Sequence, residues 1–371
     1  MPARSLVRRR LTCALSVATL VALAACQAQA DPHASRAVTS TGVPSTEAPV
    51  PVATPTRAVA PVPTVTPTPT PEPLGPHVVA QWTVANPSFL AFGFGSVWVT
   101  DHYGNTITRI DPVSNTVLAV IQGTGSNPEK ALAVGDTLWV TGQNDDTVLI
   151  DPRTNTIIKT IKGDLLFMAY GSKSVWITTR DNTLDRFDPA SAEITASIPV
   201  GVGTNDCMND VAATAAAVWV ISCDKAELVR IDPATNRVVS RVPYASLISE
   251  AEARTQAPAG KGTDSIWITV QQDDGGGGQT SGLLRVSPVT GTGISFLPLT
   301  PARLGDGFNA VTDEAVWMAG SGEVNRVDLA TNRIVATYPT AAGRLKIGVA
   351  FGSVWLRNFE QDQIQRLDVQ P

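Results

Sequence analysis

The side chains best suited to bind a ligand are polar residues that replace phenylalanine in a repeated apolar segment. Asp210 and Gln256 occupy the positions at which equivalent segments carry Phe89 and Phe167. A carboxylate and an amide at such positions can recognise a ligand by charge and by hydrogen bonds. The alternative is that these side chains line the solvated mouth of a channel. The candidate ligand-binding residues are Asn209, Asp210, Gln256, Asn309, His102, Arg180 and Arg357.

The histidine content argues against several kinds of catalytic centre. The chain has three histidines, of which His77 and His102 lie beyond residue 76. A Ser-His-Asp triad needs a histidine, and most transition-metal sites use several. We therefore predict no catalytic residue, no metal ligand and no cofactor.

The cysteines are predicted to have structural roles. Cys13 and Cys26 lie near the N-terminus, whereas Cys207 and Cys223 lie far along the chain. In an exported protein, such a pair favours a disulfide between Cys207 and Cys223. A metal ion held by the two thiolates is the alternative, although no histidine lies near them in the sequence.

The first 25 residues have the pattern of an export signal. A basic head, residues 4–10, precedes an apolar run over 11–25 that is too short to cross a bilayer comfortably. The run ends in LAAC, residues 23–26, which resembles a bacterial lipobox. We therefore expect lipidation of Cys26. The alternative is an ordinary secretory signal that ends beside an unmodified cysteine.

Residues 26–76 are predicted to form a disordered linker that carries the lipid at Cys26. The segment 27–76 holds twelve of the chain's 27 prolines, five charged side chains and no Phe, Trp or Tyr. Proline lacks an amide donor and fixes φ, so this composition favours coil or polyproline II over a packed core. An extended linker rising about 3.1 Å per residue would hold the rest of the chain up to roughly 150 Å from the membrane.

Residues 77–371 contain seven repeats of about 42 residues. Each repeat has a Val-Trp pair or a close variant, at Trp98, Trp139, Trp176, Trp219, Trp267, Trp317 and Trp355. Each tryptophan is followed by RIDP or a related sequence, at 109–112, 149–152, 186–189, 230–233, 285–288, 326–329 and 366–369. Repeats of this length, built from short alternating strands, are typical of a β-propeller.

Each repeat is predicted to supply one blade of four antiparallel strands. The first strand is small and apolar, and the second carries the tryptophan, which we expect to pack between neighbouring blades. A ring of tryptophans that stacks a ligand is the alternative. The Asp-Pro-x-Thr-Asn sequence predicts a hairpin between the third and fourth strands. The last repeat stops after its third strand, so residues 78–84 are predicted to complete that blade and close the ring.

This topology predicts two different faces. The segments that enter the first strands share one face with the loops between the second and third strands. The Asp-Pro hairpins lie on the opposite face and are short and repetitive. Because loops on a rigid scaffold are where function concentrates, we predict the binding site on the first, varied face.

The motif VWVT followed by RIDPxTNxV resembles the repeats of YVTN and YncE-type propellers. It is also similar to the streptogramin (virginiamycin B) lyase-like group. The resemblance covers residues 77–371 and implies an all-β, seven-bladed β-propeller. Lyases of that group use histidine with glutamate and a magnesium ion. Their typical WFTE is WVT in this sequence, so no catalytic residue is carried over.

Charge and export signal together narrow the function. Residues 77–371 carry 22 basic and 30 acidic side chains, a net charge of −8, which argues against a nucleic-acid partner. We predict a monomeric module, anchored to the extracytoplasmic face of the cell envelope by its lipid alone. It would bind or scaffold an envelope or extracellular protein, peptide or glycan. The alternative is an extracytoplasmic enzyme, a lyase or hydrolase related to the streptogramin lyase-like propellers.

Overall fold

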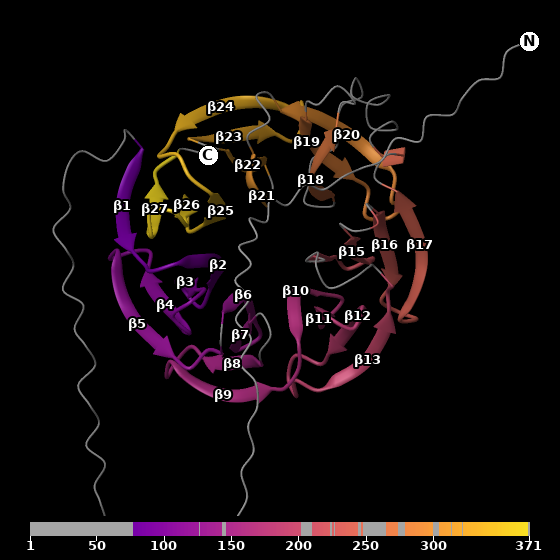
Figure 1. The fold of residues 1–371 in the computed structure, drawn as a ribbon, viewed down its shortest axis with the longest axis horizontal. Helices are drawn as coiled ribbons and strands as arrows, with labels where there is room; N and C mark the ends of the chain where they lie inside the picture. The colour runs from indigo at the N-terminus through magenta and orange to yellow at the C-terminus, as the bar shows by residue number, and fades with distance from the viewer. Residues whose placement is uncertain are drawn as a thin grey trace, which may run out of the picture. The chain divides into compact units, whose positions relative to one another are not determined.

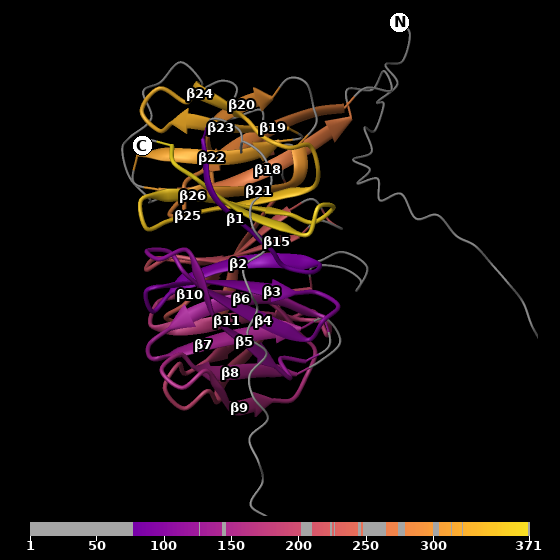
Figure 2. The same ribbon diagram turned by 90° about the vertical axis from the view of Figure 1, so that its left-hand side faces the viewer.

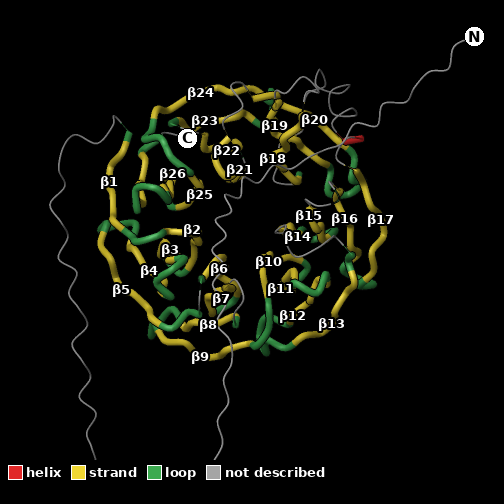
Figure 3. Tube along the Cα trace, in the orientation of Figure 1, coloured by secondary structure: helices red, strands yellow, loops and turns green. Residues whose placement is uncertain are grey.

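A computed structural model of the chain shows a ring of seven β-sheets around a central axis (Figure 1). It describes residues 77–125, 127–142, 146–201, 210–222, 225, 227–243, 246–247, 265–273, 279–299, 304–312, 314–320 and 322–369. The all-β, seven-bladed fold predicted from the repeats is confirmed. Strands and loops make up nearly all of the ring, with one helical turn at residues 246–247 (Figure 3).

Several predicted features lie outside the described residues. These are the signal segment 1–25, the linker 26–76 with its Cys26, and the cysteines Cys207 and Cys223. In the part of the chain that is described, no helix is both long and apolar enough to span a membrane.

The strands take four positions in the sheets, from the axis outward. The innermost are β2 (Pro87–Gly93), β6 (Pro128–Val134), β10 (Leu165–Gly171), β14 (Asp210–Ala213), β21 (Leu304–Val311) and β25 (Leu345–Ala350). The second are β3 (Ser96–Asp101), β7 (Thr137–Gly142), β11 (Ser174–Thr179), β15 (Val218–Ser222), β18 (Ile266–Asp273), β22 (Ala315–Gly320) and β26 (Ser353–Asn358).

The third strands are β4 (Thr106–Asp111), β8 (Thr147–Asp151), β12 (Thr183–Phe187), β16 (Glu227–Asp232), β19 (Gln279–Val286), β23 (Glu323–Asp328) and β27 (Gln363–Leu367). The outermost are β5 (Thr116–Gln122), β9 (Thr156–Ile161), β13 (Ile194–Pro199), β17 (Arg237–Pro243), β20 (Gly293–Leu299), β24 (Arg333–Pro339) and β1 (Val78–Thr83).

We number the sheets as blades in chain order. Blade 1 is β2–β5, blade 2 is β6–β9, blade 3 is β10–β13, blade 4 is β14–β17, blade 5 is β18–β20, blade 6 is β21–β24, and blade 7 is β25–β27 with β1. Six blades have four described strands and blade 5 has three. The predicted inner strand of blade 5, residues 257–260, lies outside the described residues.

Blade 7 combines strands from the two ends of the described chain. Strand β1 pairs antiparallel with β27, with Trp82 opposite Ile364. In Figures 1 and 2 the indigo β1 lies with the yellow strands of blade 7. Trp82 also stacks on Trp355 of the same blade, with ring centroids 5.5 Å apart. These contacts place β1 as the outer strand of the last blade.

The tryptophan of each repeat packs inside the ring, as predicted. Trp98, Trp139, Trp176, Trp219 and Trp355 are fully buried, and Trp317 and Trp267 are nearly so. The hydrophobic clusters cross from one blade to the next: Trp98 of blade 1 packs with Leu138 and Val140 of blade 2. The outer strands instead alternate between exposed and half-buried residues, as in β17. The core therefore lies between the blades, where large side chains fill each wedge.

The Asp-Pro hairpins adopt the predicted turn. In the hairpin after β4, Asp111 Oδ1 accepts a hydrogen bond from the Val113 amide and Oδ2 accepts one from Ser114, both at 2.8 Å. These hydrogen bonds lower the pKa of the Asp111 carboxyl below its ordinary value. The asparagines that close such hairpins have positive φ: Asn115 (56°), Asn155 (57°), Asn236 (56°) and Asn332 (52°). Asparagine tolerates this region better than most residues do.

The arginine of the RIDP motif joins one blade to the next. Arg186 of blade 3 lies over the Trp176 ring and donates from Nε to Ser174 Oγ at 2.9 Å. Its Nη1 donates to the Pro233 carbonyl oxygen and to Asn236 Oδ1 of blade 4, at 2.8 and 2.9 Å. We call this arrangement, a bond to the arginine's own blade plus a bond to the next hairpin, a clamp. The clamping arginines are Arg109, Arg186, Arg285 and Arg366.

The other three joints between blades differ from this pattern. The joint between blades 2 and 3 is apolar, because Leu149 replaces the arginine and packs with Trp139 and Ala192. At the joint between blades 4 and 5 and at the joint between blades 6 and 7, Arg230 and Arg326 lie over the tryptophan rings of their own blades. At both, alanine replaces the serine, and the arginine Nε is buried with no hydrogen-bond partner in the described part of the chain.

Candidate functional site

The varied face gathers the loops as the topology predicts. The loop after β3 meets the segment before β2 through a hydrogen bond from the His102 amide to the Asn86 carbonyl oxygen, 2.9 Å long. The loop after β26 meets the segment before β25 in the same way, from the Phe359 amide to the Arg344 carbonyl oxygen at 3.3 Å. We call this surface the loop face and the opposite one the hairpin face.

Asp210, a predicted binding residue, forms an ion pair that spans three blades. Lys130 at the start of β6 in blade 2 places its Nζ 2.8 Å from Asp210 Oδ1 in blade 4. The Lys130 ammonium also lies over the Phe167 ring of blade 3, 5.1 Å from its centroid. The side chains of Lys130 and Asp210 are 21% and 36% exposed, so a ligand at the mouth could reach both.

A second ion pair repeats this arrangement. Lys346 at the start of β25 in blade 7 lies over the Phe89 ring of blade 1, with Nζ 3.2 Å from the centroid. It ends 3.9 Å from Glu129 Oε1 of blade 2. Glu129 also accepts a hydrogen bond from Ser88 Oγ at 3.4 Å. Both charged side chains are largely buried, with 10% and 7% exposed.

Together these groups form what we call the mouth cluster: Phe89, Glu129, Lys130, Phe167, Asp210 and Lys346. In each half, a lysine crosses the aromatic ring of the next blade and meets the carboxylate of the blade after it. The rings of Phe89 and Phe167 are themselves 6.2 Å apart in an edge-to-face arrangement. Cation–π contact and charge pairing offset the cost of burying these charges. The cluster thereby links blades 1, 2, 3, 4 and 7 on the loop face.

His102 adds a titratable group beside the mouth cluster. Its Nδ1 lies 3.2 Å from Glu129 Oε2, although the geometry does not make a hydrogen bond. The attraction therefore depends on protonation of the imidazole. The neighbouring Tyr103 packs against the His102 ring at 4.6 Å and is 64% exposed. Tyr103 thus presents an aromatic surface to solvent at the edge of the cluster.

Arg357 holds the loop face together rather than projecting from it. Its side chain is buried, and Nε donates to the Ser88 carbonyl oxygen of blade 1 at 2.9 Å. Nη1 donates to the carbonyl oxygen of Arg344 at 3.0 Å. Phe359 contacts both guanidinium groups, with Arg344 Cζ 4.4 Å and Arg357 Cζ 5.6 Å from the ring centroid. Arg344 is half-exposed and pairs with Glu360 at 3.2 Å.

The remaining predicted binding residues are not brought into the mouth cluster by any described contact. Arg180 follows β11 in blade 3, and its Nε is buried without a hydrogen-bond partner among the described residues. Asn309 lies in β21 opposite Met318. Asn209 and Gln256 lie outside the described residues.

The candidate binding residues included one member of the mouth cluster, Asp210, and missed Glu129 as well as Ser88, which donates a hydrogen bond to Glu129. Glu129 lies in NPEKALAV, where an acidic residue stands two positions before the first small residue of an inner strand. That position could have identified Glu129, because burying an ionisable side chain beside the axis costs free energy unless the charge is paired. The arrangement suits recognition of a partner carrying charges of both signs. The described residues hold no group of three or more side chains able to bind a metal ion.

Comparison with known proteins supports the fold. No family description matches the chain, and no curated protein matches it. Among solved structures, the chain is similar to the Kuenenia stuttgartiensis hydrazine synthase, with a TM-score of 0.60 and 14% identity over 79% of this chain and 97% of that one. It is similar to virginiamycin B lyase from Staphylococcus aureus, with a TM-score of 0.56 and 15% identity over 78% and 98%.

A third similar structure is BamB from Moraxella catarrhalis, with a TM-score of 0.51 and 12% identity over 76% of this chain and 85% of that one. At these identities the likeness establishes the propeller fold alone.

Proposed function

We propose that this chain is a lipid-anchored β-propeller on the extracytoplasmic face of the cell envelope, and that it binds a protein or peptide partner through its loop face. The observation that carries this proposal is the rim formed by blades 7 and 1. We define the rim as His102, Tyr103, Arg344, Phe359 and Glu360.

The rim has the composition of a protein interface. Tyr103 is 64% exposed, and the half-exposed Arg344 lies over Phe359. Exposed tyrosine and arginine are enriched at the energetically important positions of protein interfaces. The rim also has charges of both signs, since Glu360 lies beside Arg344. A partner surface with complementary charges would be oriented by these groups.

The two loops of the rim are held in fixed positions. The Asn86 amide donates to Asp362 Oδ1 at 2.7 Å, and the His102 amide donates to the Asn86 carbonyl oxygen. Arg357 of blade 7 donates a hydrogen bond to the backbone of blade 1 beneath the rim. A pre-organised surface loses less entropy when it binds, which supports recognition by this rim.

Photo-crosslinking on intact cells tests the partner. p-Benzoylphenylalanine would replace Tyr103 in the full chain and, in a control, would replace Val113, which is 88% exposed on the hairpin face. We expect a discrete adduct from position 103 and not from position 113. Equal adducts at both positions, or none at either, would contradict the proposal. A small molecule that shifts the melting temperature without any adduct would instead favour the enzyme alternative.

A charge reversal makes this test specific. We expect Arg344→Glu to weaken the adduct at position 103 several-fold, because it removes the cation of the rim. The matched control is Lys162→Glu, since Lys162 is also an exposed cation paired with an acid, Asp146. The anchor is tested separately by Cys26→Ser. Fractionation should find that variant released from the membrane fraction, and its retention there would contradict the lipid anchor.

A further inference from the structure

Blade 6 carries an arginine without its usual partners. In a clamp, the arginine Nε donates to a serine, but Ala315 takes that position beside Arg326. Arg326 Nε is buried and has no hydrogen-bond partner within the described ranges. The acid that faces it is Glu314, whose Oε2 lies 4.0 Å from Nη2 and whose side chain is 75% exposed. Such an exposed pair contributes little to stability.

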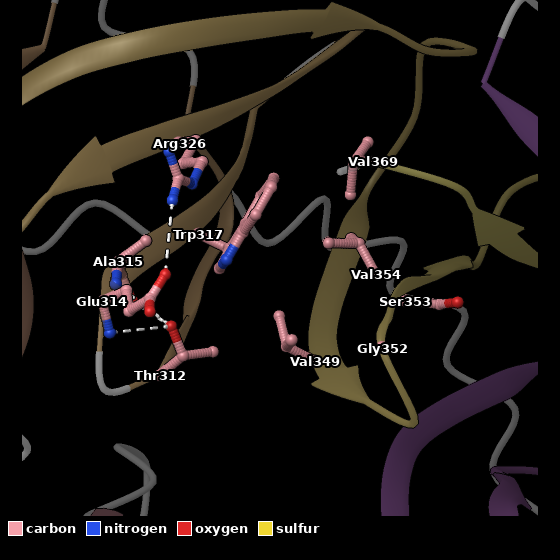
Figure 4. A pocket seen from close by; sticks show the side chains of 10 residues that line it. All are labelled: Thr312, Glu314, Ala315, Trp317, Arg326, Val349, Gly352, Ser353, Val354 and Val369. Carbon is pink, nitrogen blue, oxygen red and sulfur yellow. Dashed lines mark hydrogen bonds and ion pairs between the residues drawn. The ribbon is translucent and has the colours of Figure 1, made fainter. Parts of the chain in front are cut away.

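A cavity of about 310 Å³ lies beside this arginine, between blades 6 and 7 on the hairpin face. Figure 4 shows Arg326 and Glu314 at one side, with Val349, Val354 and Val369 lining the other. Cavities that bind small molecules begin at about this volume, and most are apolar with a few polar groups that set orientation. The guanidinium is the cation among its lining residues.

The joint between blades 4 and 5 contains a similar arginine but packs more closely. Arg230 is also beside an alanine, Ala217, and its Nε is also buried without a partner among the described residues. Here, however, the next hairpin lies directly on the tryptophan. A Cβ added to Gly291 would lie 2.6 Å from the Trp219 ring. The two joints therefore offer a matched pair, with the same unclamped arginine and a different space around it.

We propose that the cavity between blades 6 and 7 binds a small organic carboxylate whose apolar part lies against the valines and whose charge pairs with Arg326. The clamps show which atoms an arginine at this position binds. Arg186 Nη1 donates hydrogen bonds to two oxygens, one of a backbone carbonyl and one of an amide side chain. A carboxylate presents two oxygens in that geometry and adds a full negative charge. This site lies on the hairpin face, so it is distinct from the rim of the proposed function.

Glu314 is expected to oppose the ligand. Its carboxylate is the competing partner of Arg326 and would repel a second carboxylate at close range. Because the side chain is mostly exposed, it can turn into solvent when the ligand enters. Removal of its charge should therefore strengthen binding, whereas removal of the arginine's charge should weaken it.

The test uses ¹⁹F NMR with 4-fluorobenzoate as the probe. The protein is the full chain carrying Cys26→Ser, which cannot be lipidated. We expect saturable broadening of the probe signal, and no such broadening for the neutral 4-fluorobenzamide. Arg326→Gln should raise the dissociation constant by at least about tenfold, the usual effect of losing a charged hydrogen bond. Arg230→Gln is the matched control and should leave it unchanged, and Glu314→Gln should lower it.

Three results with the wild-type protein or with Arg326→Gln would overturn the proposal. The wild-type protein could fail to broaden the carboxylate at millimolar concentration, or could bind the amide equally well. Arg326→Gln could also bind as tightly as wild type. A thermal melt of each variant separates these outcomes from misfolding. If Arg326→Gln melts abnormally, Glu314→Gln still decides the matter, since unchanged or weaker binding by that folded variant contradicts the proposal.

Discussion

The joints on either side of blade 7 contain the same tryptophan and arginine but use the arginine differently. At the joint between blades 7 and 1, Arg366 donates to Ser353 on its own blade and to Asn115 of the next, at 2.9 and 3.1 Å. At the joint between blades 6 and 7, Arg326 has neither bond among the described residues, and a cavity lies beside it. An arginine in the repeat is therefore structural only where its partners are present.

The joint between blades 2 and 3 supports this distinction. There the arginine, the serine and the asparagine are all replaced, by Leu149, Thr137 and Ala192. Leu149 and Ala192 pack together in one hydrophobic cluster. An apolar joint avoids buried polar groups without partners, which are costly. Blade 6 differs because it keeps the charged arginine and loses the groups that would bind it.

The largest change in the free energy of unfolding should come from breaking a clamp. Arg366→Leu leaves the Pro112 carbonyl oxygen and Asn115 Oδ1 without their donor. We expect a loss of about 2–3 kcal/mol in the free energy of unfolding, the cost of unpaired groups at a partly buried site. Urea unfolding followed by circular dichroism measures this change. A loss below about 0.5 kcal/mol would show that the clamp adds nothing to the joint.

A smaller effect should come from rebuilding half a clamp. Ala315→Ser restores the hydroxyl that Nε of the clamping arginines binds, as Ser174 does for Arg186 at 2.9 Å. We expect the free energy of unfolding to rise by about 1 kcal/mol, because a buried donor gains its acceptor. The same urea experiment measures it. A decrease would show that Arg326 Nε is not positioned like its counterparts.

The smallest change in stability should appear when the pH is lowered. The backbone amide of Val113 and the hydroxyl of Ser114 lower the pKa of Asp111 in the folded protein. Its contribution to stability is therefore present above the unfolded value of about 3.9 and is lost as the pH falls through the folded pKa. We expect Asp111→Asn to melt below wild type at pH 6, with the gap closing toward pH 3. A gap that is constant with pH would contradict this linkage.

Much of the fold could be predicted from the repeats because its signals are local. Val-Trp marks the second strand, and Asp-Pro-x-Thr-Asn specifies a turn that asparagine closes at positive φ, as Asn115 does. The clamps could not be predicted in this way. Arg109 donates to Asn155 of the next blade, 46 residues along the chain, and its role becomes visible only when adjacent repeats are compared side by side.

The candidate site was harder to predict because its partners are further apart. Asp210 was identified because it replaces a phenylalanine, but its pairing with Lys130 joins positions 80 residues apart across another blade. Arg357 was expected on the surface, yet its long side chain reaches inward to the Ser88 carbonyl oxygen. Register along a strand predicts which residues share a face. It does not predict how far a flexible side chain will reach.

We predict that Arg326 contributes little to the free energy of unfolding, and the variant Arg326→Leu tests this. Urea unfolding of this variant should give a free energy within about 0.5 kcal/mol of wild type, since no clamp is broken and leucine keeps the apolar stem. Arg366→Leu, measured alongside, should lose several times as much. Equal losses for the two variants would contradict the account, because Arg326 would then be holding blades 6 and 7 together.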